Sequence, residues 1–478
     1  MEAVQERKGR TRNMTTGDPV SLILGFAIPM LFGTLFQQFY SMADTIIVGR
    51  FLGVDALAGV GSTAAVNFMV NGFVIGTCSG FSVPVSQRFG AGDYKDMRKF
   101  IGSLIWLTAV IAVLLTALAA LMTRRILVFM STPDNIIDYA YRYIFIIFLG
   151  IPATYLYNST ACIIRALGDS KTPVLFLVLT SLINIVLDYV SIVFLGFSVD
   201  GPALATVAAQ AFSGILCVFY MKKKFPVLRF EAREMQPDGR QCAVLLGMGL
   251  PMGLQYSVTA IGSVILQTAV NSLGSAAVAS ITAGQKIHMF CCCVFDALGG
   301  TMATYAGQNT GAGKPERIRE GVFAATKIGS IYALFICGVL IVFGDRIPLL
   351  FLDAAETEVI RGAKLFLTMT SLFYIPLAIV NIWRFTIQGM GYSGLAVLAG
   401  VCEMTARALV GFAGVPRFGY TAACFASPLA WLMADAFLIP AFFFCLRRFS
   451  ALVSKQRKAA APRTRVASRP ALSTVKGV

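Results

Sequence analysis

Apolar runs of about 20 residues recur along the whole chain, and they are the feature that most limits its fold. A helix of that length crosses the roughly 30 Å hydrocarbon core of a bilayer. The alternating ten-residue segments of a membrane barrel are not found in the sequence. Hydrophobic residues make up 57% of the chain and charged residues only 13%, which excludes an ordinary soluble domain. The sequence therefore predicts an all-α integral membrane protein.

We expect twelve transmembrane helices, six on each side of a basic linker. They lie near residues 20–42, 56–79, 101–123, 143–160, 172–195, 201–221, 242–266, 277–302, 322–345, 365–385, 394–414 and 421–446. The chain then divides into an N-terminal segment (1–19), an N-lobe (20–221), the linker (222–241), a C-lobe (242–446) and a tail (447–478). The tail has few apolar residues to bury after Ser450, so its composition predicts disorder.

The basic residues predict the orientation in the membrane. The formal net charge is +16, from 40 basic and 24 acidic residues. With both termini in the cytoplasm, 28 Lys and Arg fall on the inside and 8 in the outside loops, as the positive-inside rule requires. We therefore expect a multi-pass membrane protein with both termini in the cytoplasm. Clusters such as Lys222 to Lys224 then contact anionic lipid headgroups, and no nucleic-acid partner is expected.

The chain carries little of the chemistry that enzymes use. It has one histidine, His288, and no paired metal-ligand motif, so neither a metal site nor histidine-based catalysis is expected. A packed or headgroup-level position suits His288 better than a proton relay. All eleven cysteines fall within predicted spans, where they act as small apolar side chains. The GAG triplets at 90–92 and 311–313 lack the lysine-serine ending of a phosphate-binding loop. We expect no enzyme activity and no cofactor.

The two halves of the chain are related by an internal repeat. The segments 86–99 and 307–320 share a glutamine, the GAG triplet and an arginine, and every matched pair has the same offset in residue number. A nearly equal offset relates Ile164, Gly168, Ser170 and Val174 to Ile387, Gly391, Ser393 and Val397. Because each half has six spans, both run through the membrane in the same direction. Such parallel repeats are typical of secondary transporters that bind substrate between two lobes.

Several of these segments resemble the multidrug and toxic compound extrusion (MATE) transporters, and most closely a bacterial branch similar to the DNA-damage-inducible and archaeal-type members. The resemblance rests on ADTIIVGRFLG (43–53), IRALGDSKTP (164–173), GLPMGLQYSVTAIGS (249–263), MATYAGQNTGAGK (302–314) and the two GAG loops with Gln87 and Gln308. It implies a V-shaped pair of six-helix lobes that exports small organic, often cationic compounds by alternating access, in exchange for H+ or Na+. We expect such a protein to act as a monomer.

Two acidic residues deep in the N-lobe are the main candidates for a functional site. A carboxylate at mid-helix costs roughly 2.5 to 3.5 kcal/mol on insertion scales, so it usually faces a cavity. Asp44 shares one helical face with Gln37 and Tyr40, which precede it by seven and four residues. Asp188 follows Asn184 by one turn.

The depths of these residues predict that they meet. Asp188 and Thr206 each lie nine residues, about 13 Å, from the turn between their spans, and Asp44 lies eight residues from the turn that follows it. Two nearby carboxylates in low dielectric cannot both ionise cheaply, so the pair should hold a proton or a cation. The resemblance assigns Asp44, Asn184, Asp188 and Thr206 to the coupling site, with Tyr143 as a looser match. The alternative is that Asp188 and Asn184 only satisfy polar groups within a packed bundle.

The C-lobe lacks an equivalent acidic pair. Some members of the family that the chain resembles carry one there, but Thr259 occupies one aligned position and Gly411 is equivalent to Asp188. Glu403 and Arg407, at i and i+4, form a favourable helical ion pair with an expected structural role. If the chain is a transporter, we expect the remaining polar candidates to line its substrate cavity. These candidates are Gln37, Tyr40, Gln255, Asp296 and Asp435.

Other functions fit the sequence less well. A flippase or exporter of lipid-linked or polysaccharide substrates shares this architecture, and a strongly cationic central cavity would favour it. A membrane-embedded enzyme would require a catalytic motif that we do not find. A channel would not require two matched lobes with a carboxylate site concentrated in one of them.

Overall fold

The protein is described by a computed structural model that covers residues 13–130, 132–350 and 356–460. This part of the chain contains helices and no strand. The first half forms α1 (Pro19–Leu52), α2 (Val54–Ser62), α3 (Ala64–Ala91), α4 (Tyr94–Phe129), α5 (Ile137–Leu149), α6 (Ile151–Ala166), α7 (Lys171–Val193) and α8 (Asp200–Lys224). The second half forms α9 (Gly239–Asn271), α10 (Ser275–Gly311), α11 (Pro315–Phe343), α12 (Thr357–Ser371), α13 (Tyr374–Gly389), α14 (Ser393–Leu409) and α15 (Val415–Ala460).

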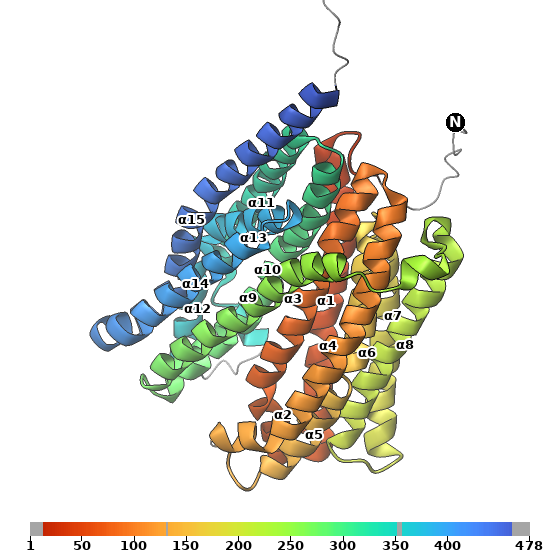
Figure 1. The fold of residues 1–478 in the computed structure, drawn as a ribbon. Helices are drawn as coiled ribbons and strands as arrows, with labels where there is room; N and C mark the ends of the chain where they lie inside the picture. The colour runs from red at the N-terminus through yellow and green to blue at the C-terminus, as the bar shows by residue number, and fades with distance from the viewer. Residues whose placement is uncertain (1–12, 131, 351–355, 461–478) are drawn as a thin grey trace, which may run out of the picture.

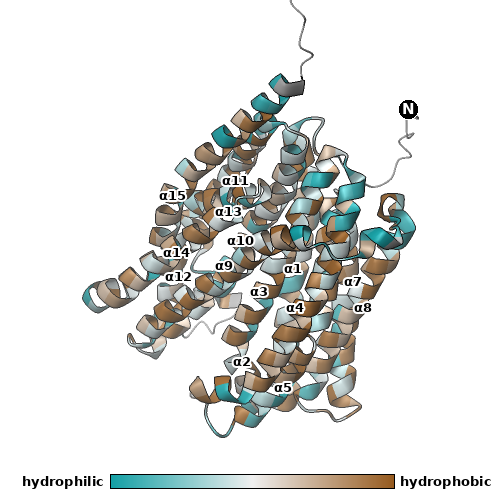
Figure 2. Cartoon of the chain, in the orientation of Figure 1, coloured by the Kyte–Doolittle hydropathy of each residue, from teal (hydrophilic) through white to brown (hydrophobic). Residues whose placement is uncertain are grey.

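The helices account for the twelve predicted spans. In the described residues, nine helical stretches are long and apolar enough to cross a membrane, and two bent pairs raise the number to eleven. The pairs are α5 with α6, bent by 46°, and α12 with α13, bent by 53°. The stretch from α14 to α15 is counted once among these. The chain nevertheless reverses near Gly419, where φ is 59°, and α14 and α15 pack against each other, so this stretch contains two spans. Figure 2 shows hydrophobic residues along the middle of the helices and hydrophilic residues toward their ends.

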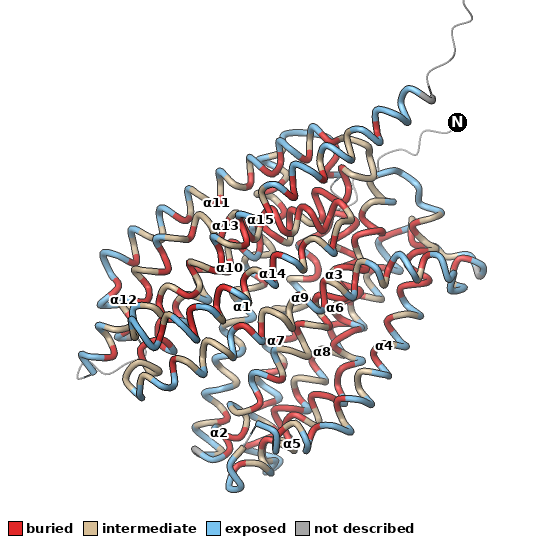
Figure 3. Tube along the Cα trace, turned by 60° about the vertical axis from the view of Figure 1, so that its left-hand side comes forward, coloured by how far each residue is buried: buried red, intermediate tan, exposed pale blue. Residues whose placement is uncertain are grey.

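The helices form two lobes that meet at one end of the molecule. Figure 1 shows α1 to α8 on one side and α9 to α15 on the other, with both termini at the same end. The lobes contact each other mainly through α3 with α9, and through α10 with α1 and α3. The most apolar stretches of α3 and α10 are each 56% buried, more than those of the other spans, and Figure 3 shows long buried stretches on them. The two lobes and the all-α membrane architecture agree with the prediction.

A symmetric set of contacts closes the end that carries the termini. Gln87 donates from Nε2 to the carbonyl oxygen of Gly389 at 3.0 Å, and Gln308 donates from Nε2 to that of Ala166 at 2.9 Å. A Cβ atom on Gly90 would lie 1.9 Å from the carbonyl oxygen of Gln308, and one on Gly311 would lie 1.7 Å from that of Gln87. Only glycine permits this approach. We call these four residues and the two carbonyl acceptors the closed-end contacts.

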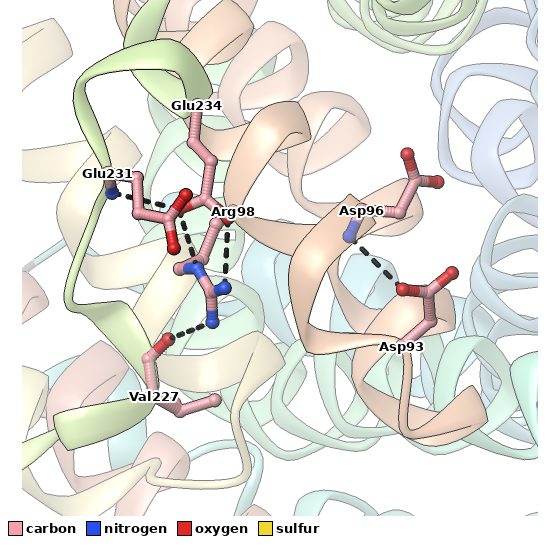
Figure 4. A network of polar contacts seen from close by, with 6 residues as sticks. All are labelled: Asp93, Asp96, Arg98, Val227, Glu231 and Glu234. Carbon is pink, nitrogen blue, oxygen red and sulfur yellow. Dashed lines mark hydrogen bonds and ion pairs between the residues drawn. The ribbon is translucent and has the colours of Figure 1, made fainter.

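The linker between the lobes packs on the start of α4 (Figure 4). Arg98 pairs with both carboxylate oxygens of Glu234 at 2.7 and 2.9 Å, and it also donates to the carbonyl oxygen of Val227 at 3.3 Å. The Arg98 guanidinium holds the pKa of Glu234 below its usual range. Trp106 donates from its indole N–H to the carbonyl oxygen of Met235 at 2.9 Å. The linker is thus attached to the N-lobe.

Both ends of the described chain pack more closely than their composition suggests. Met14 is fully buried, and its N–H donates to Oε1 of Gln308 at 2.9 Å, while Asn309 donates to its carbonyl oxygen at 3.1 Å. The prediction of disorder after Ser450 is wrong for the first ten residues, because α15 continues to Ala460. Arg457 helps to hold that extension by donating to the carbonyl oxygen of Gly313 at 3.1 Å. Residues 461–478 lie outside the described chain.

Candidate functional site

Side chains from four helices of the N-lobe converge around two carboxyl groups. Asp44 on α1 and Asp188 on α7 lie close enough for one carboxyl group to hydrogen-bond the other. Tyr40, one turn before Asp44, lies beside both acids and beside Thr206 on α8. Tyr143 on α5 also lies near the pair. The distances from the turns predicted that Asp44, Asp188 and Thr206 lie at a similar depth in the membrane. The structure agrees, because these three side chains lie close together.

Asp188 is buried, Asp44 is half-buried, and the pair carries unused hydrogen-bonding capacity. The side chain of Asp188 is fully buried, and Nδ2 of Asn184 donates to its Oδ1 at 3.3 Å. Oδ2 of Asp188, Oδ1 of Asp44 and the hydroxyl of Thr206 are buried without a hydrogen-bond partner. Within the described residues, neither acid forms a salt bridge. Buried polar groups of this kind normally have partners.

A cavity of about 370 Å³ reaches this cluster from inside the N-lobe. Asp44, Tyr40, Gln37, Tyr143, Asn184 and Thr206 line it, together with the amides of Asn67, Asn71, Asn158 and Gln210. Along α1 the lining extends from Met30 to Asp44, which corresponds to about 21 Å at 1.5 Å per residue. Arg165 on α6 also lines the cavity. Asp44 thus faces this cavity, whereas Asp188 is buried beside Asp44 and is not part of the lining.

The arrangement fits a site for a proton or a small cation. Two carboxyl groups in contact repel each other when both are ionised, and a shared proton or a bound cation removes that repulsion. Their free oxygens, the Asn184 side chain and the Thr206 hydroxyl are oxygen ligands that hard cations prefer. No third acidic, histidine or cysteine side chain in the described chain completes a group suited to a transition metal.

The equivalent depth of the C-lobe holds a fixed ion-pair network. Glu403 pairs directly with Arg384 of α13 and lies 3.6 Å from Arg407. All three residues are buried. The sequence predicted the Glu403–Arg407 pair but missed Arg384, which pairs more closely with Glu403. No local pattern could have revealed it, because Arg384 reaches Glu403 from another helix.

Three further candidates lie in the C-lobe, away from the carboxyl pair. Asp435 is buried near Arg384, and one of its carboxylate oxygens has no hydrogen-bond partner. Gln255 accepts a hydrogen bond of 2.6 Å from Gln388. His288 contacts the hydroxyl of Tyr374 at 2.8 Å and stacks on Trp431, so it is packed, as its position predicted. None of the three lines the N-lobe cavity.

Asp296 differs from these buried groups. It lies near the middle of the 37-residue helix α10, and its side chain is exposed. Tyr256 of α9 and Cys292, one turn earlier on α10, lie close to it. It forms no salt bridge in the part of the chain that the structure describes.

Comparisons with known proteins place the chain in one family. The MatE family profile matches residues 29–190 and 251–412, which together make up more than half of the chain. The starts of the two matches, at positions 29 and 251, differ by nearly the same offset as the paired residues of the internal repeat. The chain therefore belongs to the MatE family of MATE transporters and is a multi-pass membrane transporter.

Curated relatives and solved structures agree with this assignment. The chain is 29% identical over 357 residues to the probable multidrug resistance protein YoeA of Bacillus subtilis, covering 72% of this chain and 76% of the relative. It is 22% identical over 391 residues to an FAD transporter of Shewanella oneidensis, covering 80% and 85%. A solved structure described as the outward-facing conformation of a multidrug resistance MATE family transporter superposes with a TM-score of 0.85 at 22% identity, covering 94% and 99%. That likeness shows the fold.

Proposed function

We propose that this transporter exports organic, often cationic compounds in exchange for H+ or Na+, and that the N-lobe carboxyl pair couples the two movements. The observation that carries the proposal is the contact between the half-buried Asp44 and the buried Asp188, two acids without a salt bridge in the described chain. An ionisable pair inside the membrane is costly, which is why such groups usually mark ion pathways. The multidrug resistance names of relatives support drug efflux.

The position of the pair suggests how binding and conformation are linked. The lobes contact each other at the end that carries the termini, which the basic residues place in the cytoplasm. This arrangement corresponds to an outward-facing state, in which the pair takes its ion from outside. Loading removes the repulsion between the acids, and the resulting change in charge biases a two-state rearrangement of helices. Release of substrate to the outside follows from that bias.

A flavin nucleotide is a less suitable substrate for these sites. One relative is named an FAD transporter, so relatives of this chain are not confined to drugs. FAD carries negative phosphate groups, however, which Asp44 in the cavity and the exposed Asp296 would repel, while the basic Arg165 of the cavity and Lys286 of α10 partly offset that repulsion. We therefore favour cationic or neutral compounds.

Everted membrane vesicles provide the test. Export of a fluorescent cation into the vesicles should be driven by an imposed pH gradient or by an imposed sodium gradient, and the ion that drives it is the coupling ion. Asp188→Asn should abolish this driven transport while leaving the protein inserted and folded. Transport at a rate that changes with neither gradient would contradict the proposal. A fully active Asp188→Asn variant would also contradict it.

A further inference from the structure

We propose that Asp296 and Tyr256 form a binding site for an organic cation, separate from the carboxyl pair in the N-lobe. The inference rests on the proposed function as an exporter, and it assigns the substrate class and the residues that bind it. It depends on three features of the described chain, namely the position of Asp296, its lack of a counter-ion and the aromatic ring beside it.

The first feature is the location of Asp296 on the face of α10 that meets the N-lobe. Asp296 follows Cys293 by three residues and precedes Gly300 by four, so the three share one helical face. Cys293 interacts with the Thr34 side chain of α1, and a Cβ on Gly300 would lie 2.6 Å from the methyl carbon of Met30. Thr34 and Met30 also line the N-lobe cavity. Asp296 therefore lies between the lobes, next to the cavity wall.

The second feature is an open face that ends at this residue. Gln285, Met289 and Asp296 are exposed on α10. Beyond Gly300, from Thr301 to Asn309, nearly every residue is buried, in part by the core of the C-lobe and in part by the contact between the lobes. Asp296 is consequently the deepest exposed residue on this face, where a bound molecule would reach the point at which the lobes join.

The third feature is the absence of a counter-ion. The arginines of the C-lobe have other acidic partners, because Arg384 and Arg407 both contact Glu403 and Arg384 also lies near Asp435. Asp296 itself has no ion pair among the described residues. A carboxylate at mid-membrane is retained when it binds something. Tyr256 of α9 also lies between the lobes, because a Cβ on Gly72 of α3 would be 3.0 Å from the Cβ of Tyr256, and its phenol ring can attract a cation through its face.

The two acidic sites then have different tasks. A cation between the lobes contacts Asp296 on α10, whereas the coupling ion binds between α1 and α7. Because the sites do not share a carboxyl group, substrate and ion do not compete for one charge. Their coupling passes through the relative position of the lobes, and it is reciprocal in equilibrium binding.

The test measures binding of radiolabelled tetraphenylphosphonium to the full chain in lipid nanodiscs. Tetraphenylborate, which has the same shape and the opposite charge, is the control ligand. We expect the phosphonium to bind and the borate not to bind above the level of empty nanodiscs. Asp296→Asn should weaken phosphonium binding by about 10-fold, and Asp296→Glu should restore it. Tyr256→Leu should weaken binding, and Tyr256→Phe, which keeps the ring, should not.

Two control variants separate this inference from the proposed function. Glu320→Gln removes an exposed acidic side chain near the start of α11 in the same lobe and should leave phosphonium affinity unchanged. Asp188→Asn should lose driven transport and keep phosphonium binding. Unchanged phosphonium affinity in Asp296→Asn would overturn the cation site and leave the coupling proposal standing. Normal driven transport by Asp188→Asn would overturn the coupling proposal and leave the cation site standing.

Discussion

The two lobes match each other at the closed end and differ in their interiors. At the closed end, Gln87 and Gln308 make equivalent hydrogen bonds, and their acceptors Ala166 and Gly389 occupy equivalent positions of the internal repeat. Deeper in the membrane the equivalence is lost. The position of Asp188 corresponds to Gly411 in the C-lobe, and that of Asn184 corresponds to Arg407.

This difference shows how duplicated halves divide their work. The closed-end contacts depend on backbone shape and on two amides, so both copies have kept the same residues. The interior of the C-lobe holds fixed cations, Arg384 and Arg407, around Glu403. The N-lobe keeps an acidic pair with free oxygens instead. The proposed ion site therefore lies in the lobe whose acids have no salt bridge among the described residues, while Glu403 of the other lobe lies between two arginines.

The largest expected effect comes from removing charge in the N-lobe. Asp188→Asn keeps the shape of the side chain but removes the titrating group, so driven export should fall to the rate of vesicles without the protein. Asp44→Asn should do the same. Because both residues serve one site, the double variant should be no worse than either single variant. Residual driven export in the single variants that is lost only in the double variant would mean that the two acids act independently.

Reagents that cannot cross the membrane should reach the N-lobe site from the outside and not from the cytoplasm. Ser41 and Thr45, which are exposed and flank Asp44, are replaced by cysteine in turn in a background without the eleven native cysteines. Asp44 lies eight residues, about 12 Å, from the end of α1. A membrane-impermeant thiol reagent should label both positions from outside. Labelling from the cytoplasmic side alone would overturn the orientation or the site.

The closed-end contacts should show a smaller and symmetric effect. Gln87→Ala and Gln308→Ala each remove one hydrogen bond between lobes, worth about 0.5–1.5 kcal/mol, so each should raise the population opened at that end by about 2- to 10-fold. Spin labels at the exposed Lys95 and Glu316 would report the separation of the lobes.

Alanine at Gly311 provides a steric counterpart to these deletions. It should open the same end further, because its Cβ would overlap the carbonyl oxygen of Gln87. Gln308 also accepts from the N–H of Met14, so an excess effect at Gln308 would measure that additional contact. No change in spin-label separation in any of these variants would show that the closed-end contacts do not hold the lobes together.

Local patterns predicted most of the fold and the N-lobe site, and contacts between distant segments account for what they missed. The apolar runs predicted every span, and helix rise placed Asp44, Asp188 and Thr206 at one depth because helices beside a short turn must be antiparallel neighbours. The bends in two spans were not predicted. The helix after Ser450 was missed because Arg457 docks on Gly313, far away in the sequence. The partnership of Arg384 with Glu403 depends likewise on packing between helices.

The smallest expected effect concerns the C-lobe positions equivalent to the coupling site. Gly411 lies in the short π-helical segment between α14 and α15, and a Cβ there would be 3.5 Å from its nearest neighbour, so alanine fits. Gly411→Ala and Thr259→Ala remove no charge and should leave the apparent affinity for the coupling ion unchanged, as measured from the ion dependence of driven export. Asp188→Glu, which keeps the charge but moves the carboxyl group, is the positive control and should shift that affinity. A shift of the apparent ion affinity in either C-lobe variant would show that the second lobe also takes part in ion binding. Neither substitution removes a charge, so such a shift would require the substituted residue to be coupled to the ion site.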